Sequence, residues 1–165
     1  MKALIIVDVQ NDFCNSIPHA HKIIDSLNKT ITFAKKNKWL IVASRDWHLS
    51  GDYCVKDTNG AEFNSELLID ENMTIISKES YSAFDGYNFS LDSFFKKNNI
   101  KEVYIAGLAT DYCVKDTAID SVKYGYNTHV IWDASQGLFN KKSEKEIENE
   151  LKNNNVKIVF LKDIL

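Results

Sequence analysis

The chain has 165 residues, is 44% hydrophobic and carries a net charge of -3, so we expect one domain with its own core over residues 1–165. This composition excludes the basic footprint of a nucleic-acid-binding protein, and no apolar stretch is long enough to cross a membrane. The single proline and six glycines argue against a disordered chain. Three cysteines without scaffold spacing fit the reducing cytoplasm better than a disulfide framework.

Apolar runs alternate with helical patterns from end to end. The first run, residues 3–7, is short and acidic residues follow it, so it indicates a buried strand rather than a signal peptide. Six such runs predict strands, at 3–7, 39–43, 74–77, 103–107, 128–132 and 156–161. Helical spacing or caps predict helices within 23–34, 91–95, 111–124 and 141–153. The segment 45–72 is loop-rich, with a short helix expected over 61–68.

Alternating strands and helices of this kind predict an α/β fold, with a parallel sheet covered by helices on both faces. Ligands of such sheets bind at the carboxyl ends of the strands. Four chemically capable residues follow strand ends and should share that edge of the sheet: Asp8, Asp46, Lys78 and Cys113.

Cys113 is the strongest candidate nucleophile. It lies where a buried strand passes into a helix, and the N–H groups and dipole of a helix N-terminus favour the thiolate. A thiol also needs a base, for which Asp8 is a candidate, and Lys78 could orient and balance that base. Backbone N–H groups before Cys113 could hold an oxyanion. From spacing alone, Cys113 could equally be a packed core thiol, Asp8 a cap and Lys78 a solvated lysine.

Five segments, in chain order, carry a family resemblance. They are DVQNDFC at 8–14, SRDWH at 44–48, CVKDTNGAEF at 54–63, KESYSAF at 78–84 and GLATDYCV at 107–114. Together they resemble the isochorismatase-like cysteine hydrolases, and specifically the nicotinamidase branch. A cysteine at position 113 argues against the isochorismate-cleaving branch.

The resemblance implies a three-layer α/β/α, Rossmann-like fold with six parallel strands in the order 3-2-1-4-5-6. It implies a triad of Asp8 as base, Lys78 as its partner and Cys113 as nucleophile. The N–H groups of Ala109 and Cys113 would hold the oxyanion, beside a cis peptide bond at Leu108-Ala109. The substrate pocket would be lined by Phe13, Trp47, Tyr81, Leu108 and Tyr112.

The implied activity is that of a cytoplasmic cysteine amidohydrolase in NAD salvage, which converts the small molecule nicotinamide to nicotinate and ammonia through a thioester. The family often forms homo-oligomers. Two alternatives stay open: a metal-independent hydrolase of another small amide or carbamoyl compound, and a non-catalytic binding protein that kept the fold.

The resemblance also implies a divalent metal, zinc, iron or manganese, and here the chain departs from the pattern. Asp46 and His48 match the family's DxH ligands, but Tyr53 stands where the last metal histidine is expected. Zinc usually takes three protein ligands, so Asp52 or Tyr53 would have to complete the set. Alternatively, Asp46 and His48 form a hydrogen-bonded pair that shapes the loop.

Overall fold

The computed structural model describes residues 1–165 and contains one six-stranded sheet, whose strands are ordered β3-β2-β1-β4-β5-β6. All neighbouring strands are parallel. The strands are β1 (Lys2–Val7), β2 (Leu40–Asp46), β3 (Thr74–Lys78), β4 (Glu102–Leu108), β5 (Asn127–Gln136) and β6 (Lys157–Val159). This architecture confirms the predicted fold class and strand order.

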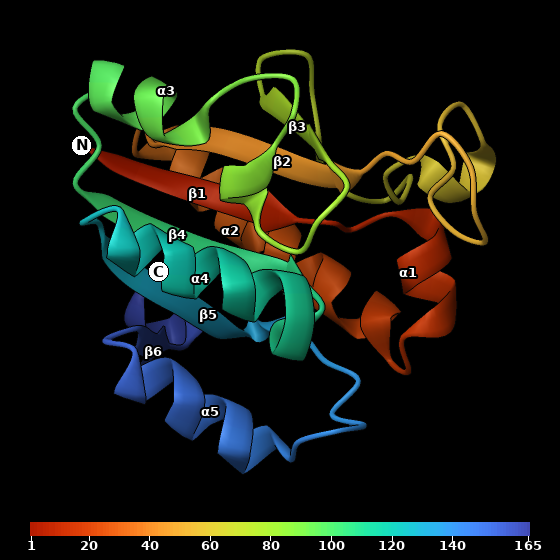
Figure 1. Ribbon diagram of the computed structural model, residues 1–165. Coiled ribbons are helices and arrows are strands. Elements are labelled where there is room, and N and C mark those ends of the chain that lie inside the picture. Colours follow the sequence, from red (N-terminus) through yellow and green to blue (C-terminus); the bar gives the residue numbers. More distant parts are fainter.

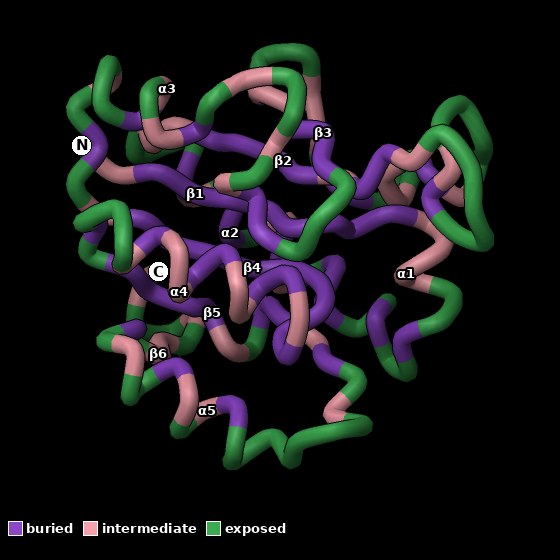
Figure 2. Tube along the Cα trace, in the orientation of Figure 1, coloured by how far each residue is buried: buried purple, intermediate pink, exposed green.

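Helices cover the sheet on both faces (Figure 1). They are α1 (Asn11–Ser16), α2 (Ile24–Lys36), α3 (Leu91–Lys97), α4 (Lys115–Lys123) and α5 (Glu144–Asn153). Leu27 and Ile31 of α2 pack with one set of strand side chains. Phe95 of α3, Ala118 of α4 and Leu151 of α5 pack with the opposite set. Alternate strand residues therefore enter two separate cores, and Figure 2 shows the central strands buried along their lengths.

The local chain geometry departs from the sequence predictions at three places. The segment 61–68 contains no α-helix, because its backbone follows a 3₁₀ turn at Asn59–Ala61 and then further turns. The helix expected over 111–124 begins as a π-helical turn, Thr110–Val114, before α4. Helix α1 was not predicted, because none of its six residues is buried and the helix has no apolar stripe.

The close approach of β1 and β4 requires glycine at position 107. Gly107 pairs with Val7, and its φ of +128° lies where side chains are rarely tolerated. A Cβ at this position would also clash with the Val7 backbone. Because β1 and β4 are neighbours, the residues that follow them, Asp8 and Cys113, emerge side by side.

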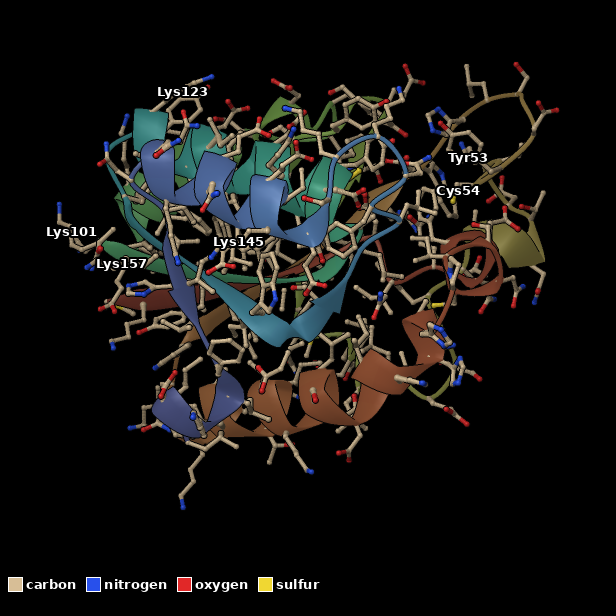
Figure 3. The ribbon with its side chains drawn as sticks, turned by 90° about the horizontal axis from the view of Figure 1, so that it is seen from below. Tyr53, Cys54, Lys101, Lys123, Lys145 and Lys157 are labelled. Carbon is tan, nitrogen blue, oxygen red and sulfur yellow. The ribbon has the colours of Figure 1, made fainter.

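The carboxyl ends of the strands and the loops after them lie at one end of the molecule. In Figure 3, Tyr53 and Cys54 lie at this end, while Lys101 and Lys157, which lie near the amino ends of β4 and β6, are at the other. No helix combines the length and apolar character needed to cross a membrane.

Candidate active site

A buried lysine connects the predicted catalytic residues. The Lys78 Nζ atom lies 2.7 Å from Asp8 Oδ2 and 3.5 Å from Cys113 Sγ. The side chains of Lys78 and Asp8 are completely buried, and Cys113 is 6% exposed. The structure therefore brings together the three residues named from the sequence: Lys78 ends β3, Asp8 follows β1, and Cys113 lies in the turn after β4.

Asp8 is held in place by its neighbour on β2. Its Oδ1 atom accepts a 2.7 Å hydrogen bond from the Ser44 hydroxyl, and its backbone N–H donates to the Ser44 carbonyl. The backbone of Asp8 has a φ of +50°, in the left-handed region that aspartate tolerates better than most residues. These contacts leave the second carboxylate oxygen to face Lys78.

Asp46 is a fourth member of this cluster, and its contact with Lys78 was not anticipated. Its Oδ1 atom lies 2.5 Å from Lys78 Nζ, so the lysine joins two buried carboxylates. The register of β2 and β3 explains the contact, because Asp46 and Lys78 are paired and parallel partners project to the same side. The sequence indicated only that both residues lie at the same edge of the sheet. Asp46 therefore belongs to the charge balance of the cluster as well as to the expected metal site.

Burial and charge shift the ionisation of this cluster. Burial, followed by the negative charge of Asp8, raises the pKa of the Cys113 thiol well above its usual range. Burial lowers the pKa of Lys78, but the surrounding anionic groups, Asp8 first, outweigh it and the pKa is raised overall. The resting cluster therefore holds a protonated thiol and a cationic lysine, so Cys113 needs a base when it reacts.

The turn that carries Cys113 has a distinctive backbone. The Leu108-Ala109 peptide bond is cis, as predicted. The Ala109 carbonyl accepts hydrogen bonds from the N–H groups of Tyr112 and Val114, at 3.0 and 3.1 Å. The turn places the Cys113 side chain at the edge of a cavity, where it also packs against the core between the sheet and the helices.

A second anchor for this turn was missed from the sequence. The buried Asp111 carboxylate accepts hydrogen bonds from the N–H groups of Leu138 and Phe139, at 3.0 and 2.6 Å. It ties the Cys113 turn to the loop after β5. No sequence signal predicted it, because the partners are backbone groups 27 and 28 residues away.

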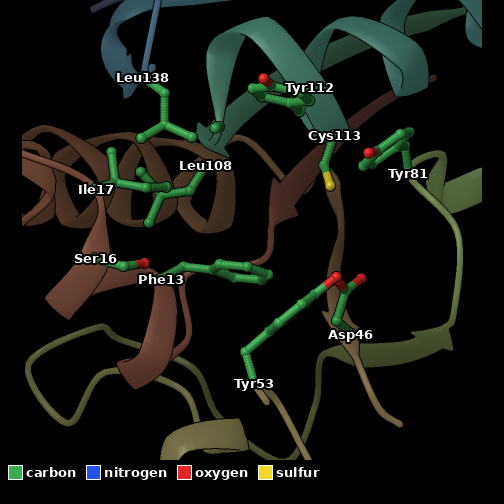
Figure 4. A pocket seen from close by; sticks show the side chains of 11 residues that line it. Phe13, Ser16, Ile17, Asp46, Tyr53, Tyr81, Leu108, Tyr112, Cys113 and Leu138 are labelled. Carbon is green, nitrogen blue, oxygen red and sulfur yellow. The ribbon is translucent and has the colours of Figure 1, made fainter. Parts of the chain in front are cut away.

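The cavity beside Cys113 has a volume of about 340 Å³ and is mainly apolar (Figure 4). Four of the five predicted pocket residues line it: Phe13, Tyr81, Leu108 and Tyr112. The others that line it are Ser16, Ile17, Asp46, Tyr53, Ala109, Cys113 and Leu138. An aromatic or aliphatic body of a small substrate would fit these walls, with its reactive group at Cys113.

Trp47, the fifth predicted pocket residue, lies elsewhere. Its ring is 8% exposed and packs with Cys54 and Ala61. The Arg45 guanidinium lies 3.6 Å from the centre of the ring, which is a cation–π contact. Its contact with Arg45, two residues earlier, keeps Trp47 out of the cavity lining.

Gln10 connects the end of β1 to the wall of the cavity. Its amide nitrogen donates to the carbonyls of Asp46 and Ala61, at 2.8 and 2.9 Å, and its amide oxygen accepts from the Asp46 N–H. The Asp12 carboxylate accepts a 2.7 Å hydrogen bond from the Cys54 N–H. Gln10 and Asp12 thus hold the loop after β2, which gives a physical reason for the motif at 8–14.

Asp46 and His48 have the geometry of two metal ligands. His48 Nε2 is buried, has no hydrogen-bond partner and lies 3.5 Å from Asp46 Oδ2. Two donors that each lie ~2.1 Å from a tetrahedral zinc ion are roughly 3.4 Å apart. The pair therefore allows a divalent metal, whose other ligands would come from substrate, solvent or Tyr53; Asp52 is exposed and lies outside the cavity wall.

The group formed by Asp8, Asp46 and Cys113 is a weaker candidate for a metal. One donor atom of each lies within 4.8 Å of the others. However, the Lys78 ammonium lies among them at 2.5 to 3.5 Å and already balances their charge. A metal is therefore better accommodated on the His48 side of Asp46.

Known proteins resemble this chain in both sequence and fold. The nicotinamidase of Escherichia coli is 31% identical over 178 aligned residues, which cover 83% of this chain and 84% of that protein. The pyrazinamidase of Pyrococcus horikoshii, solved in complex with zinc, is 37% identical with a TM-score of 0.87, covering 96% of this chain and 98% of that one. The yeast nicotinamidase bound to the inhibitor nicotinaldehyde is 26% identical with a TM-score of 0.84, covering 97% and 100%.

The comparison with protein families agrees with these similarities. The family described as the isochorismatase domain matches residues 2–159, which include all six strands and each residue of the Lys78 cluster. The chain therefore belongs to the isochorismatase family of hydrolases.

Proposed function

We propose that this chain is a nicotinamidase, which hydrolyses nicotinamide to nicotinate and ammonia through a thioester on Cys113. The observation that carries the proposal is the Cys113 thiol at the edge of an apolar cavity, 3.5 Å from the ammonium of Lys78, which in turn lies 2.7 Å from Asp8. The nicotinamidases among its relatives support the choice of substrate.

The first half of the reaction forms the thioester. Asp8 takes the proton of the Cys113 thiol, and the cation of Lys78 stabilises the thiolate as it forms. The sulfur attacks the carboxamide carbon, and the N–H groups of Ala109 and Cys113 hold the resulting oxyanion. The C–N bond then breaks as Asp8 returns its proton to the departing nitrogen, which leaves as ammonia.

The second half releases the acid. Water enters where ammonia has left, Asp8 takes one of its protons, and the oxygen attacks the thioester carbon. The C–S bond breaks, the acid departs and the proton on Asp8 returns to the Cys113 sulfur. Each turnover thus restores the protonated thiol that burial favours in the resting cluster.

A metal would act at the wall of the cavity rather than at the sulfur. Asp46 Oδ2 and His48 Nε2 would hold it, and zinc, iron or manganese all accept such oxygen and imidazole ligands. Bound there, a divalent metal would supply a positive charge and a Lewis acid at this wall. The reaction also fits the cytoplasm, since all three cysteines are free thiols.

The test is ammonia release from nicotinamide by the purified protein, with and without prior treatment with a chelator. We expect turnover by the untreated protein and stoichiometric nicotinate. Absence of turnover, even after zinc, iron or manganese is added back, would refute nicotinamide as the substrate. Full activity after complete metal removal would show that the metal is dispensable.

A further inference from the structure

The polar groups that face the cavity are few, and most are already engaged. The Ser16 hydroxyl donates to the Asp12 carbonyl, and the Tyr112 hydroxyl donates to Asn140 Oδ1 at 2.9 Å. Asp46 is bound to Lys78. Among the side chains that line the cavity, only Tyr53 and Tyr81 carry hydroxyl groups without a partner in the chain.

These two tyrosines enter the cavity from different sides (Figure 4). Tyr81 lies next to Cys113, where its ring meets that of Tyr112 with centroids 5.8 Å apart. Tyr53 reaches into the cavity from the opposite wall, and its hydroxyl end points toward Asp46 (Figure 4). A carboxamide at Cys113 would therefore direct its ring toward Tyr53.

Contacts within the chain fix the position of Tyr53, although 49% of the residue is exposed. Its ring packs against Phe13 and His48, with centroid distances of 5.6 and 5.4 Å. The next residue, Cys54, is fixed at both backbone groups: its N–H donates to Asp12 and its carbonyl accepts from the His48 N–H. Such a tyrosine can present its hydroxyl in a defined direction with little loss of side-chain entropy.

We propose that the Tyr53 hydroxyl donates a hydrogen bond to an acceptor atom on the substrate ring, and so selects heteroaromatic carboxamides over carbocyclic ones. This inference rests on the proposed function and names its substrate class. A phenol is an uncharged donor at neutral pH. In a mainly apolar cavity, a ring nitrogen that met no donor would be left unsatisfied, whereas a benzene ring loses nothing there.

The test compares binding of nicotinamide and benzamide, which differ by one ring nitrogen. Affinities are measured by titration calorimetry on chelator-treated Cys113→Ala protein, so that neither turnover nor metal contributes. We expect nicotinamide to bind about fivefold more tightly than benzamide, the ratio that one neutral hydrogen bond supplies. Adding Tyr53→Phe should reduce the ratio to within about twofold through loss of nicotinamide affinity alone.

The matched control is Tyr124→Phe, which removes a hydroxyl from an exposed tyrosine outside the cavity. It should leave both affinities unchanged. An unaltered ratio in Tyr53→Phe would overturn the inference. So would loss of bound metal from Tyr53→Phe before chelation, measured by elemental analysis, because Tyr53 would then be a metal ligand instead.

Binding and turnover separate this inference from the proposed function. If wild-type protein does not hydrolyse nicotinamide but Tyr53→Phe abolishes the binding preference, the proposed function fails and the Tyr53 assignment stands. If wild-type protein is active and the preference does not depend on Tyr53, only the assignment fails. Thermal unfolding of each variant checks that the fold is intact.

Discussion

Two regions face the same cavity but are held in place differently. One is the cluster of Lys78, Asp8, Asp46 and Cys113, and the other is the wall formed by Tyr53 and the loop after β2. Lys78 and Asp8 are completely buried and follow strands of the sheet, whereas Tyr53 is 49% exposed and belongs to the loop after β2. The cluster is held by ion pairs and hydrogen bonds between neighbouring strands. The wall is held by Gln10 and Asp12, which reach across from the segment after β1.

We infer from this difference that the two regions have separate roles, the cluster in the reaction and the wall in the choice of substrate. Strand ends are fixed by the hydrogen bonds of the sheet, so they suit groups that must meet within hydrogen-bond distance. Loops can change length and sequence without disturbing the sheet, so they suit the choice of substrate. Tyr53, which replaces the expected histidine, lies on such a loop and lines the cavity, apart from the ion pairs of the Lys78 cluster.

The largest effect should come from the nucleophile. Cys113→Ala removes the group that forms the thioester, so kcat should fall by at least ~10⁴-fold. Cys14→Ala, which changes a thiol outside the cavity, should stay within about twofold of wild type. Ammonia release measures both, and substantial turnover by Cys113→Ala would place the chemistry elsewhere.

Lys78→Met should damage both rate and stability. It leaves Asp8 and Asp46 buried without their counterion, so the free energy of unfolding should fall by about 3–5 kcal/mol. The loss of the cation should lower kcat by roughly 10²–10³-fold. Denaturant unfolding and ammonia release measure these changes.

A second substitution separates the two effects of Lys78→Met. Adding Asp46→Asn removes one of the uncompensated charges and should restore part of the stability but none of the rate. Lys123→Met, at a 71% exposed side chain, is the control and should change neither quantity. Equal stability of Lys78→Met and wild type would contradict the charge balance described for the cluster.

Asp8→Asn should move activity and thiol reactivity in opposite directions. The negative charge of Asp8 contributes to the raised pKa of Cys113, so its removal lowers that pKa and increases the thiolate fraction at a given pH. Alkylation of Cys113 by iodoacetamide at pH 8 should therefore accelerate, while amidase activity is lost. Peptide mass spectrometry across a pH series measures the rate; slower alkylation would show that Asp8 favours the thiolate.

The smallest effect should come from the link between the two regions. Gln10→Leu leaves the backbone of Asp46 and the carbonyl of Ala61 without partners, so stability should fall by about 1–3 kcal/mol. The wall would loosen more than the cluster, so KM should rise several-fold while kcat stays nearly constant. Asn37→Ala, which removes one exposed side-chain hydrogen bond, is the control. A change in the kcat of Gln10→Leu without a change in KM would contradict the separate roles of the two regions.

Local patterns in the sequence predicted the strands, because each strand is an apolar run, and so predicted which polar residues follow a strand end. The strand order that brings Asp8 beside Cys113, and the choice of Lys78 as their partner, came from the family resemblance. The wall was harder to predict because its side chains are directed by contacts between distant segments. The position of Trp47 over Arg45, the hydrogen bonds of Gln10 and the anchoring of the nucleophile turn by Asp111 all depend on partners that no local pattern reveals.

The most direct test of the central claim is to trap the thioester. Wild-type protein is mixed with nicotinamide, quenched in acid within the first turnover and digested, and the peptides are analysed by mass spectrometry. We expect a nicotinoyl group on the peptide that contains Cys113 and none in Cys113→Ala. A nicotinoyl group on Cys14 or Cys54, with Cys113 unmodified, would contradict it.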